Sequence, residues 1–244
     1  MVPVGVRALA FDVFGTVVDW RGSIVAEGQA LGVLRGVAAD WEAVADGWRA
    51  RYQPALDAVN QGRRPWATLD ELHRATLAET LAEHGLEALG AEDRERLVAA
   101  WHRLRAWPDA RAGLELLRRR FVLATLSNGH VALLVDLARH NQLPFDVILS
   151  AELAGRYKPD PAVYRRATEL LGLAPAAVMM VAAHPPDLRA ARAVGLRTAL
   201  VHRPLEHGPA RRPAAPPAAG GDVELVADDL VDLARLLEQA PPGP

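Results

Sequence analysis

Polar residues able to perform chemistry follow three short apolar runs of the sequence. They are Asp12, Thr16, Ser127, Asn128, His184 and Asp187. Carboxylate, hydroxyl and imidazole groups gathered in one place can act as nucleophile, general base or donor to a bound anion. In open parallel sheets, ligands bind beyond the carboxyl ends of the strands, so these side chains are expected to meet at one edge. Lys158 precedes a proline-initiated helix and is expected on a loop at the same edge.

The elements that must position these residues alternate along the chain. Strand-like runs are Ala8–Phe14, Phe121–Leu126, Val147–Leu149, Val178–Ala183 and Thr198–Val201, and amphipathic helical segments are Ala112–Arg120, Val131–His140, Pro161–Leu171 and Asp187–Val194. Such alternation is typical of βαβ units and a parallel sheet, so we predict an α/β fold. Two helix starts are well marked. Asp160 offers an N-cap before Pro161, and Thr68 to Glu71 has capping-box spacing.

A helical stretch interrupts this alternation from about Trp20 to Arg105. Apolar residues recur there at helical spacing: Val44, Trp48, Tyr52, Ala55, Val59, then Leu69, Leu72, Leu77, Leu81. We therefore predict a helical cap subdomain, residues 20–105, inserted into a core domain made of residues 1–19 and 106–244. Residues 209–221 are rich in proline and alanine and predict a flexible linker. An edge strand at Val223–Val226 and a closing helix at Leu230–Leu237 are expected after it.

Bulk composition excludes several classes of protein. Half of the 244 residues are hydrophobic and the formal net charge is −2, which predicts a globular chain without a dedicated nucleic-acid surface. There is no cysteine, so disulfides, thiolate metal sites and a cysteine nucleophile are excluded. The first residues carry charges at Arg7 and Asp12 and do not resemble a signal peptide. No apolar run reaches the length of a membrane span, so a cytoplasmic protein is expected.

Four segments occur in the order of the four haloacid dehalogenase superfamily motifs. They are FDVFGT (Phe11–Thr16), LSNG (Leu126–Gly129), YKPDPAVY (Tyr157–Tyr164) and VAAHPPD (Val181–Asp187). The chain most closely resembles the type II L-2-haloacid dehalogenases, over nearly its whole length and including the helical insertion. That resemblance implies a Rossmann-like parallel sheet core with a helical cap. It also implies hydrolytic release of halide from a short 2-halo acid, with water as co-substrate, no cofactor and a homodimeric assembly.

The position two residues after Asp12 separates two chemistries of this superfamily. Most of its phosphatases carry a second aspartate there, which protonates the departing alcohol and helps hold Mg²⁺; this chain has Phe14. General-acid catalysis is worth about 10²–10⁴-fold when an alkoxide leaves. Halide can leave unprotonated, and an apolar wall suits a carbon centre. Phe14 therefore favours carbon–halogen chemistry without a metal ion, and Val13 beside it is expected to contribute to the substrate site.

The resemblance implies that Asp12 is the covalent nucleophile. Its carboxylate would displace halide by attack on the halogen-bearing carbon, and water would then hydrolyse the ester. Thr16 and Ser127 are implied to orient the nucleophile and bind the substrate carboxylate, although ordinary capping hydroxyls are an equal alternative from the residues alone. Asn128 is implied to help hold the anion, with an Asx turn at Gly129 as its alternative.

Charged and aromatic residues complete the expected site. Lys158 would keep Asp12 ionised, with Tyr164 donating to Lys158 or to Asp187. Arg49, beside Trp48, matches the cap arginine that receives the halide. Asp187 resembles the carboxylate that orients the hydrolytic water, and a helix N-cap role competes with this one. Trp66 could line the pocket, although packing elsewhere is as good an interpretation.

The fourth motif departs from the best-known dehalogenases. Ala182 and His184 stand where they carry serine and asparagine, and Pro186 replaces an aromatic residue. A histidine there could position water, act as a base or be structural. Two alternatives therefore stay open: a divergent Mg²⁺-dependent phosphatase, and a non-catalytic ligand-binding protein that keeps the fold. The sequence does not specify the halogen, the chain length of the substrate or the dimer interface.

Overall fold

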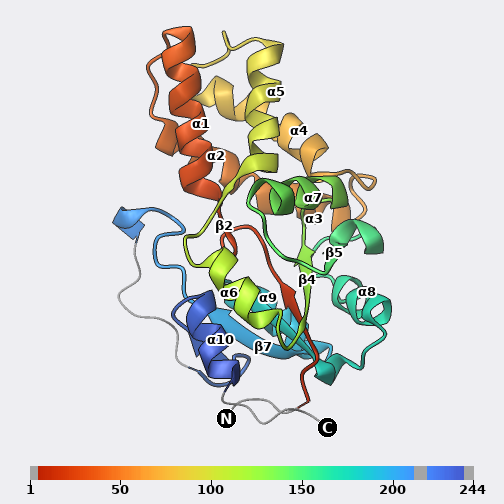
Figure 1. The fold of residues 1–244 in the computed structure, drawn as a ribbon. Helices are drawn as coiled ribbons and strands as arrows, with labels where there is room; N and C mark the ends of the chain where they lie inside the picture. The colour runs from red at the N-terminus through yellow and green to blue at the C-terminus, as the bar shows by residue number, and fades with distance from the viewer. Residues whose placement is uncertain (1–4, 212–218, 239–244) are drawn as a thin grey trace.

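The computed structural model describes residues 5–211 and 219–238, and its centre is a six-stranded parallel sheet (Figure 1). The strand order is β5-β4-β1-β6-β7-β8. The strands are β1 (Ala8–Phe11), β4 (Val122–Ser127), β5 (Val147–Ser150), β6 (Val178–Ala182), β7 (Arg197–Val201) and β8 (Leu225–Ala227). Every residue of β1 and β6 is buried, as expected for central strands of a parallel sheet covered on both faces. The predicted α/β class is confirmed.

Helices of the sheet region connect and cover these strands. They are α6 (Ala110–Leu117), α7 (Val131–His140), α8 (Pro161–Leu171), α9 (Pro185–Ala193) and α10 (Leu230–Glu238). Two of them, α7 and α8, have the predicted bounds. The caps of α8 are local: Asp160 accepts a hydrogen bond from the Ala162 amide at its start, and Gly172 ends it in the left-handed conformation. At the start of α7, by contrast, the Val131 amide donates to the distant Glu152 carboxylate. Short 3-10 helices, η2 (Ala151–Ala154), η3 (Pro175–Ala177) and η4 (Pro209–Arg211), join the remaining elements.

A second group of helices lies at the other end of the molecule, above the sheet in Figure 1. It comprises α1 (Trp20–Arg35), α2 (Trp41–Ala50), α3 (Tyr52–Asn60), α4 (Leu69–Glu83), α5 (Ala91–Ala100) and the 3-10 helix η1 (Trp101–Arg103). The chain enters and leaves this group through an antiparallel pair, β2 (Val18–Asp19) and β3 (Arg105–Ala106). We propose the division into a core (1–19, 106–244) and a cap (20–105), because both crossings fall at this pair.

The capping box predicted in the helical group is present, and the periodic stretch before it is helical. Thr68 accepts from the Glu71 amide, while the Glu71 carboxylate accepts from the Thr68 amide, so the capping box at the start of α4 is present. The periodic stretch from Val44 to Val59 is divided into α2 and α3 at Arg51. No described helix has the length and hydropathy of a membrane span.

The chain after β1 differs from the prediction in a way that shapes the site. The strand ends at Phe11 rather than Phe14, and the next residues form a tight loop in which the Val13 carbonyl accepts from the Val17 and Val18 amides. Val13 and Phe14 are buried in this loop, so their apolar character reflects burial rather than strand pairing. The predicted edge strand lies at Leu225–Ala227, and residues 212–218 of the predicted linker are outside the described residues.

Candidate active site

Asp12 stands at the carboxyl end of the central strand β1, and each of its carboxylate oxygens is held by a buried partner. The Thr16 hydroxyl donates to Oδ2 at 2.7 Å, and this hydroxyl itself accepts from the Ala183 amide at 2.8 Å. The Lys158 ammonium donates to Oδ1 at 2.9 Å. Asp12 and Lys158 expose 7% and 6% of their surface, so this ion pair is formed in a region of low dielectric constant.

Lys158 is fixed from several directions. Its ammonium lies 2.5 Å from Oδ2 of Asp187, whose Oδ1 accepts from the Tyr164 hydroxyl at 2.6 Å. Its backbone amide donates to Oδ1 of Asn128 at 2.8 Å. Elements far apart in sequence therefore place one positive charge between two carboxylates. Of the two partners considered for Tyr164, the structure selects Asp187.

The charges of this group follow from burial and pairing. Burial raises the pKa of Asp12, but the charge of Lys158 and the hydrogen bond from His184 outweigh burial and hold this pKa well below its usual range. Burial lowers the pKa of Lys158, but the charges of Asp12 and Asp187 outweigh burial, so the net shift is upward. Burial raises the pKa of Asp187 despite its contact with Lys158. Asp12 is thus an anion at neutral pH.

His184 forms a second cationic contact with Asp12. Its Nδ1 lies 3.1 Å from Oδ2 of Asp12, and its Nε2 lies 2.9 and 3.0 Å from the two oxygens of Glu206. Burial lowers the pKa of His184, but the hydrogen bonds and charges of Asp12 and Glu206 outweigh burial and raise the pKa to about 10. The ring is therefore an imidazolium that donates to a carboxylate from each nitrogen.

Glu206 was not singled out from the sequence. It lies in the loop after β7, with 5% of its surface exposed, and also accepts from the indole of Trp20 at 3.1 Å. The only sequence signal is its position beyond the carboxyl end of a strand, which is the rule that located the other residues. Gly15 makes room for it: this glycine has a φ of +86°, and a Cβ there would lie 2.2 Å from Oε1 of Glu206.

A cavity of about 570 Å³ lies at the junction of the sheet and the helical group, beside the ion pairs of Asp12. Its lining residues are Asp12, Phe14, Arg49, Tyr52, Gln53, Asn128, Lys158, Pro159, Tyr164, His184, Pro185, Pro186 and Asp187. Gln53 and Tyr52 were not expected, although they follow Arg49 at helical spacing of three and four residues. Phe14 gives the cavity an apolar wall and packs edge-on against Trp101, with ring centroids 5.7 Å apart.

Arg49 brings to this cavity a guanidinium that forms no ion pair with any described residue. Its guanidinium carbon lies 3.9 Å from the ring centroid of Tyr52 and 5.1 Å from that of Trp20. Its Nη1 is buried and has no hydrogen-bond partner among the described residues. Stacked rings hold the guanidinium in place while its donor stays unsatisfied. This arrangement suits a small anion supplied by a ligand.

Some predicted residues lie behind the cavity or away from it. Val13, Thr16 and Ser127 are buried but do not line it, and the Ser127 hydroxyl accepts from the Gly129 amide at 3.2 Å. Trp66 does not line this cavity, and of its two interpretations the packing contact is the one seen. It stacks on Tyr157 with ring centroids 4.7 Å apart, because the stretch before α4 folds against the loop that carries Lys158.

The donor set does not fit a divalent cation at Asp12. The Lys158 ammonium already lies between Asp12 and Asp187, and the imidazolium of His184 faces the second oxygen of Asp12. A divalent ion there would meet two positive charges, and Phe14 contributes no carboxylate. The arrangement instead places the buried, ionised carboxylate of Asp12 and the guanidinium of Arg49 on the same cavity.

Comparison with known proteins identifies the family of this chain. The family model for haloacid dehalogenase-like hydrolases matches residues 6–195. The chain is 32% identical to (S)-2-haloacid dehalogenase 4A of Burkholderia cepacia, over 81% of this chain and 83% of that protein. It is 49% identical to an L-2-haloacid dehalogenase of known structure, with a TM-score of 0.91 and coverage of 97% and 100%. A defluorinating L-2-haloacid dehalogenase is 42% identical, with a TM-score of 0.91 and coverage of 96% and 95%. The chain belongs to the haloacid dehalogenase-like hydrolase family.

Proposed function

We propose that this protein hydrolyses the carbon–halogen bond of short L-2-halo acids, with Asp12 as covalent nucleophile. One observation carries the proposal: a buried, ionised carboxylate faces a cavity that has an apolar wall and an arginine nitrogen without a partner. Names of the relatives support the substrate class.

In the first step, a carboxylate oxygen of Asp12 attacks the carbon that bears the halogen. A carbon–oxygen bond forms, and the carbon–halogen bond breaks with its electron pair leaving as halide. No proton is needed for this departure, which agrees with Phe14 in place of an acid. Arg49 stabilises the developing halide charge, and stabilisation of this kind contributes about 10²–10³-fold to a rate.

In the second step, water attacks the carbonyl carbon of the Asp12 ester. The acyl–oxygen bond breaks, the hydroxy acid leaves, and Asp12 regains a carboxylate that contains one oxygen from water. We assign the base for this water to His184 with Glu206 behind it. Both oxygens of Asp187 are already engaged, by Lys158 and Tyr164. Ester formation also removes the charge of Asp12 from beside His184, so the pKa of His184 falls and the ring releases one proton to solvent. The neutral ring then accepts a proton from the attacking water and returns it to the oxygen of the departing hydroxy acid.

Halide release tests the proposal directly. Chloroacetate, fluoroacetate and each enantiomer of 2-chloropropionate are incubated with wild type and with Asp12→Asn, in the presence of EDTA. We expect release by wild type, selective for the L enantiomer, and a loss of about 10⁴-fold or more in Asp12→Asn, as for removal of other nucleophiles.

A single turnover in ¹⁸O-labelled water tests the covalent step. Label is expected in the peptide that contains Asp12, because ester hydrolysis returns a water oxygen to that carboxylate. Label found only in the hydroxy acid would indicate direct attack by water and overturn the nucleophilic role. Mg²⁺-stimulated phosphate release from an aryl phosphate, without halide release, would establish the phosphatase alternative, and neither activity would favour a binding protein.

Assembly and location complete the proposal. A homodimer is expected from the family resemblance, and sedimentation velocity on the purified chain tests it. A cytoplasmic location is also proposed, and fractionation of the producing cell tests it. Sedimentation as a monomer at working concentrations would contradict the first of these expectations.

A further inference from the structure

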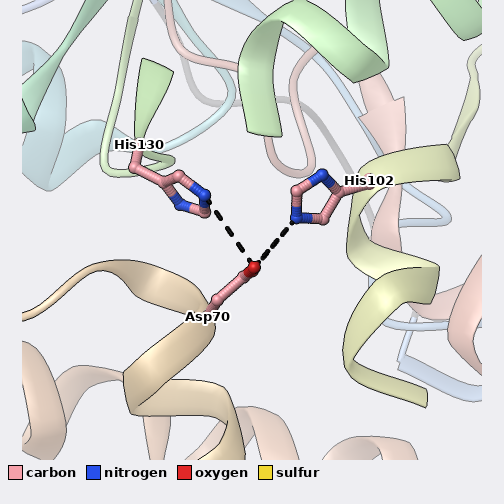
Figure 2. Close-up of side chains that lie close together, drawn as sticks. All are labelled: Asp70, His102 and His130. Atoms are coloured by element: carbon pink, nitrogen blue, oxygen red, sulfur yellow. Dashed lines mark hydrogen bonds and ion pairs between the residues drawn. The ribbon is translucent and has the colours of Figure 1, made fainter. Parts of the chain in front are cut away.

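Asp70, His102 and His130 converge at a second place in the molecule, away from the cavity that contains Asp12. Figure 2 shows the three side chains directed toward one point. Their potential ligand atoms all lie within 4.8 Å of one another. Nε2 of His102 is 3.1 Å from Oδ2 of Asp70, and Nε2 of His130 is 3.9 Å from the same oxygen. Ligand atoms about 2.0–2.1 Å from a tetrahedral metal ion are roughly 3.3 Å from one another. Small side-chain rotations would therefore bring the three ligand atoms to the distances that a bound ion requires.

His130 is buried beside Asp70 without forming a hydrogen bond to it. Only 8% of its surface is exposed, yet its Nδ1 is buried with no hydrogen-bond partner in the described part of the chain. Its Nε2 faces Asp70 at a distance beyond hydrogen bonding. Among the described residues, Nε2 of His130 therefore makes no hydrogen bond that a metal ion would have to displace.

His102 is oriented by a carboxylate behind it. Its Nδ1 lies 2.7 Å from Oδ2 of Asp136, and this contact directs Nε2 toward Asp70. A histidine that ligates a metal ion commonly donates its other N–H to a carboxylate in this manner, which fixes the tautomer and strengthens the ligand. Asp136 thus holds the His102 ring in the orientation that directs Nε2 toward Asp70.

The group is accessible and joins two parts of the fold. Asp70 and His102 line an open cavity of about 510 Å³, through which an ion and its water can enter. Asp70 belongs to α4 and His102 to η1, both in the helical group, whereas His130 is the N-cap residue of α7 in the sheet region. A bound ion therefore links the helical group to the sheet region.

We propose that Asp70, His102 and His130 bind a divalent transition-metal ion, with Zn²⁺ as the reference ion. Two imidazoles and one carboxylate form a ligand set typical of Zn²⁺ and its first-row neighbours, with the fourth position left to water from the cavity. This site is separate from Asp12, and its role is to hold the helical group on the sheet region.

Calorimetric titration with ZnCl₂ on chelator-treated, full-length protein tests the site, together with visible absorption after addition of Co²⁺. The variants are Asp70→Asn and His102→Gln. Two controls match them: His84→Gln changes a histidine of the helical group outside the cluster, and Asp12→Asn changes the carboxylate of the active-site cavity. Thermal unfolding without metal confirms that each variant is folded.

Wild type and both controls are expected to bind one ion per chain and to show the bands of four-coordinate Co²⁺. Asp70→Asn and His102→Gln should bind about tenfold more weakly or worse and lose those bands. Zn²⁺ at a hundredfold excess over its Kd should raise the Tm of wild type by about 5–10 °C. No saturable binding, unchanged affinity in both variants, or loss of binding in Asp12→Asn would each overturn the proposal. None of these readouts depends on dehalogenase activity.

Discussion

Nε2 of His184 lies 2.9 Å from Oε1 of Glu206, a residue 22 positions further along the chain. The loop after β7 brings the carboxylate to the ring, and Gly15 leaves the space that it occupies. Through this contact, a residue outside the four motifs sets the charge of the histidine that faces Asp12. The same contact explains in physical terms how the fourth motif accommodates a charged histidine at position 184.

Glu206→Gln should slow ester hydrolysis more than ester formation. The amide lacks the charge that supports the histidine as a base, and general-base catalysis is worth about 10²–10⁴-fold, so kcat should fall about 100-fold. The covalent adduct on Asp12 should accumulate and be visible by intact-protein mass spectrometry during turnover. Glu224→Gln is the control, because this carboxylate pairs with Arg192 and Arg197 outside the site. An unchanged kcat and no adduct in Glu206→Gln would remove Glu206 from the mechanism.

Arg49→Gln should lower the rate of halide departure, whereas Arg51→Gln should not. Arg49 borders the cavity with an unpaired nitrogen, while Arg51, two residues later, pairs with Glu79 and Glu83. A fall of about 10²–10³-fold in kcat/KM is expected for Arg49→Gln, and inhibition by added chloride should weaken in parallel. Equal losses in the two variants would indicate a general effect of cap charge instead.

Gly15→Ala should destabilise the fold more than Gly36→Ala. Both glycines have positive φ, +86° and +67°, so both substitutions strain the backbone by about 1–2 kcal/mol. Only at position 15 does a Cβ collide with Glu206, whereas Gly36 has open space. Urea unfolding should therefore give a larger loss for Gly15→Ala, and its kcat should resemble that of Glu206→Gln. Equal stability losses would show that Glu206 simply moves aside.

Stability should decrease as the pH rises from about 6.5 to about 10. The folded pKa of His184 is raised to about 10 from an unfolded value of 6.5, so its stabilising charge is fully present below pH 6.5 and is lost through this window. Each pKa unit corresponds to about 1.4 kcal/mol. Urea unfolding across this range should show a flatter profile for His184→Gln than for His84→Gln. Parallel profiles would contradict the raised pKa.

Several properties of this protein followed from sequence alone because their causes are local. The bounds of α8 depend on the cap at Asp160, on Pro161 and on Gly172, and the capping box at Thr68 needs only its own turn. Alternation of apolar runs with amphipathic segments determined the α/β class. The rule that ligands bind beyond the carboxyl ends of parallel strands then placed Asp12, Asn128 and Lys158 at one rim.

Other properties depend on contacts between residues far apart in sequence. Arg49 and Arg51 share a helical stretch, and only packing against Trp20 and Tyr52 makes one a cavity residue and the other a surface ion pair. The two interpretations of Trp66 could not be separated from sequence for the same reason, since its partner Tyr157 comes from another loop.

The sequence by itself determined the order of the main strands and helices and the family, because these depend on short-range pattern. Only the tertiary structure decided the charge of His184, the choice of Asp187 as partner of Tyr164, and the meeting of Asp70, His102 and His130. A charge or a ligand set depends on distances across loops and on burial. Those quantities exist only after long-range packing has excluded water and brought the groups together.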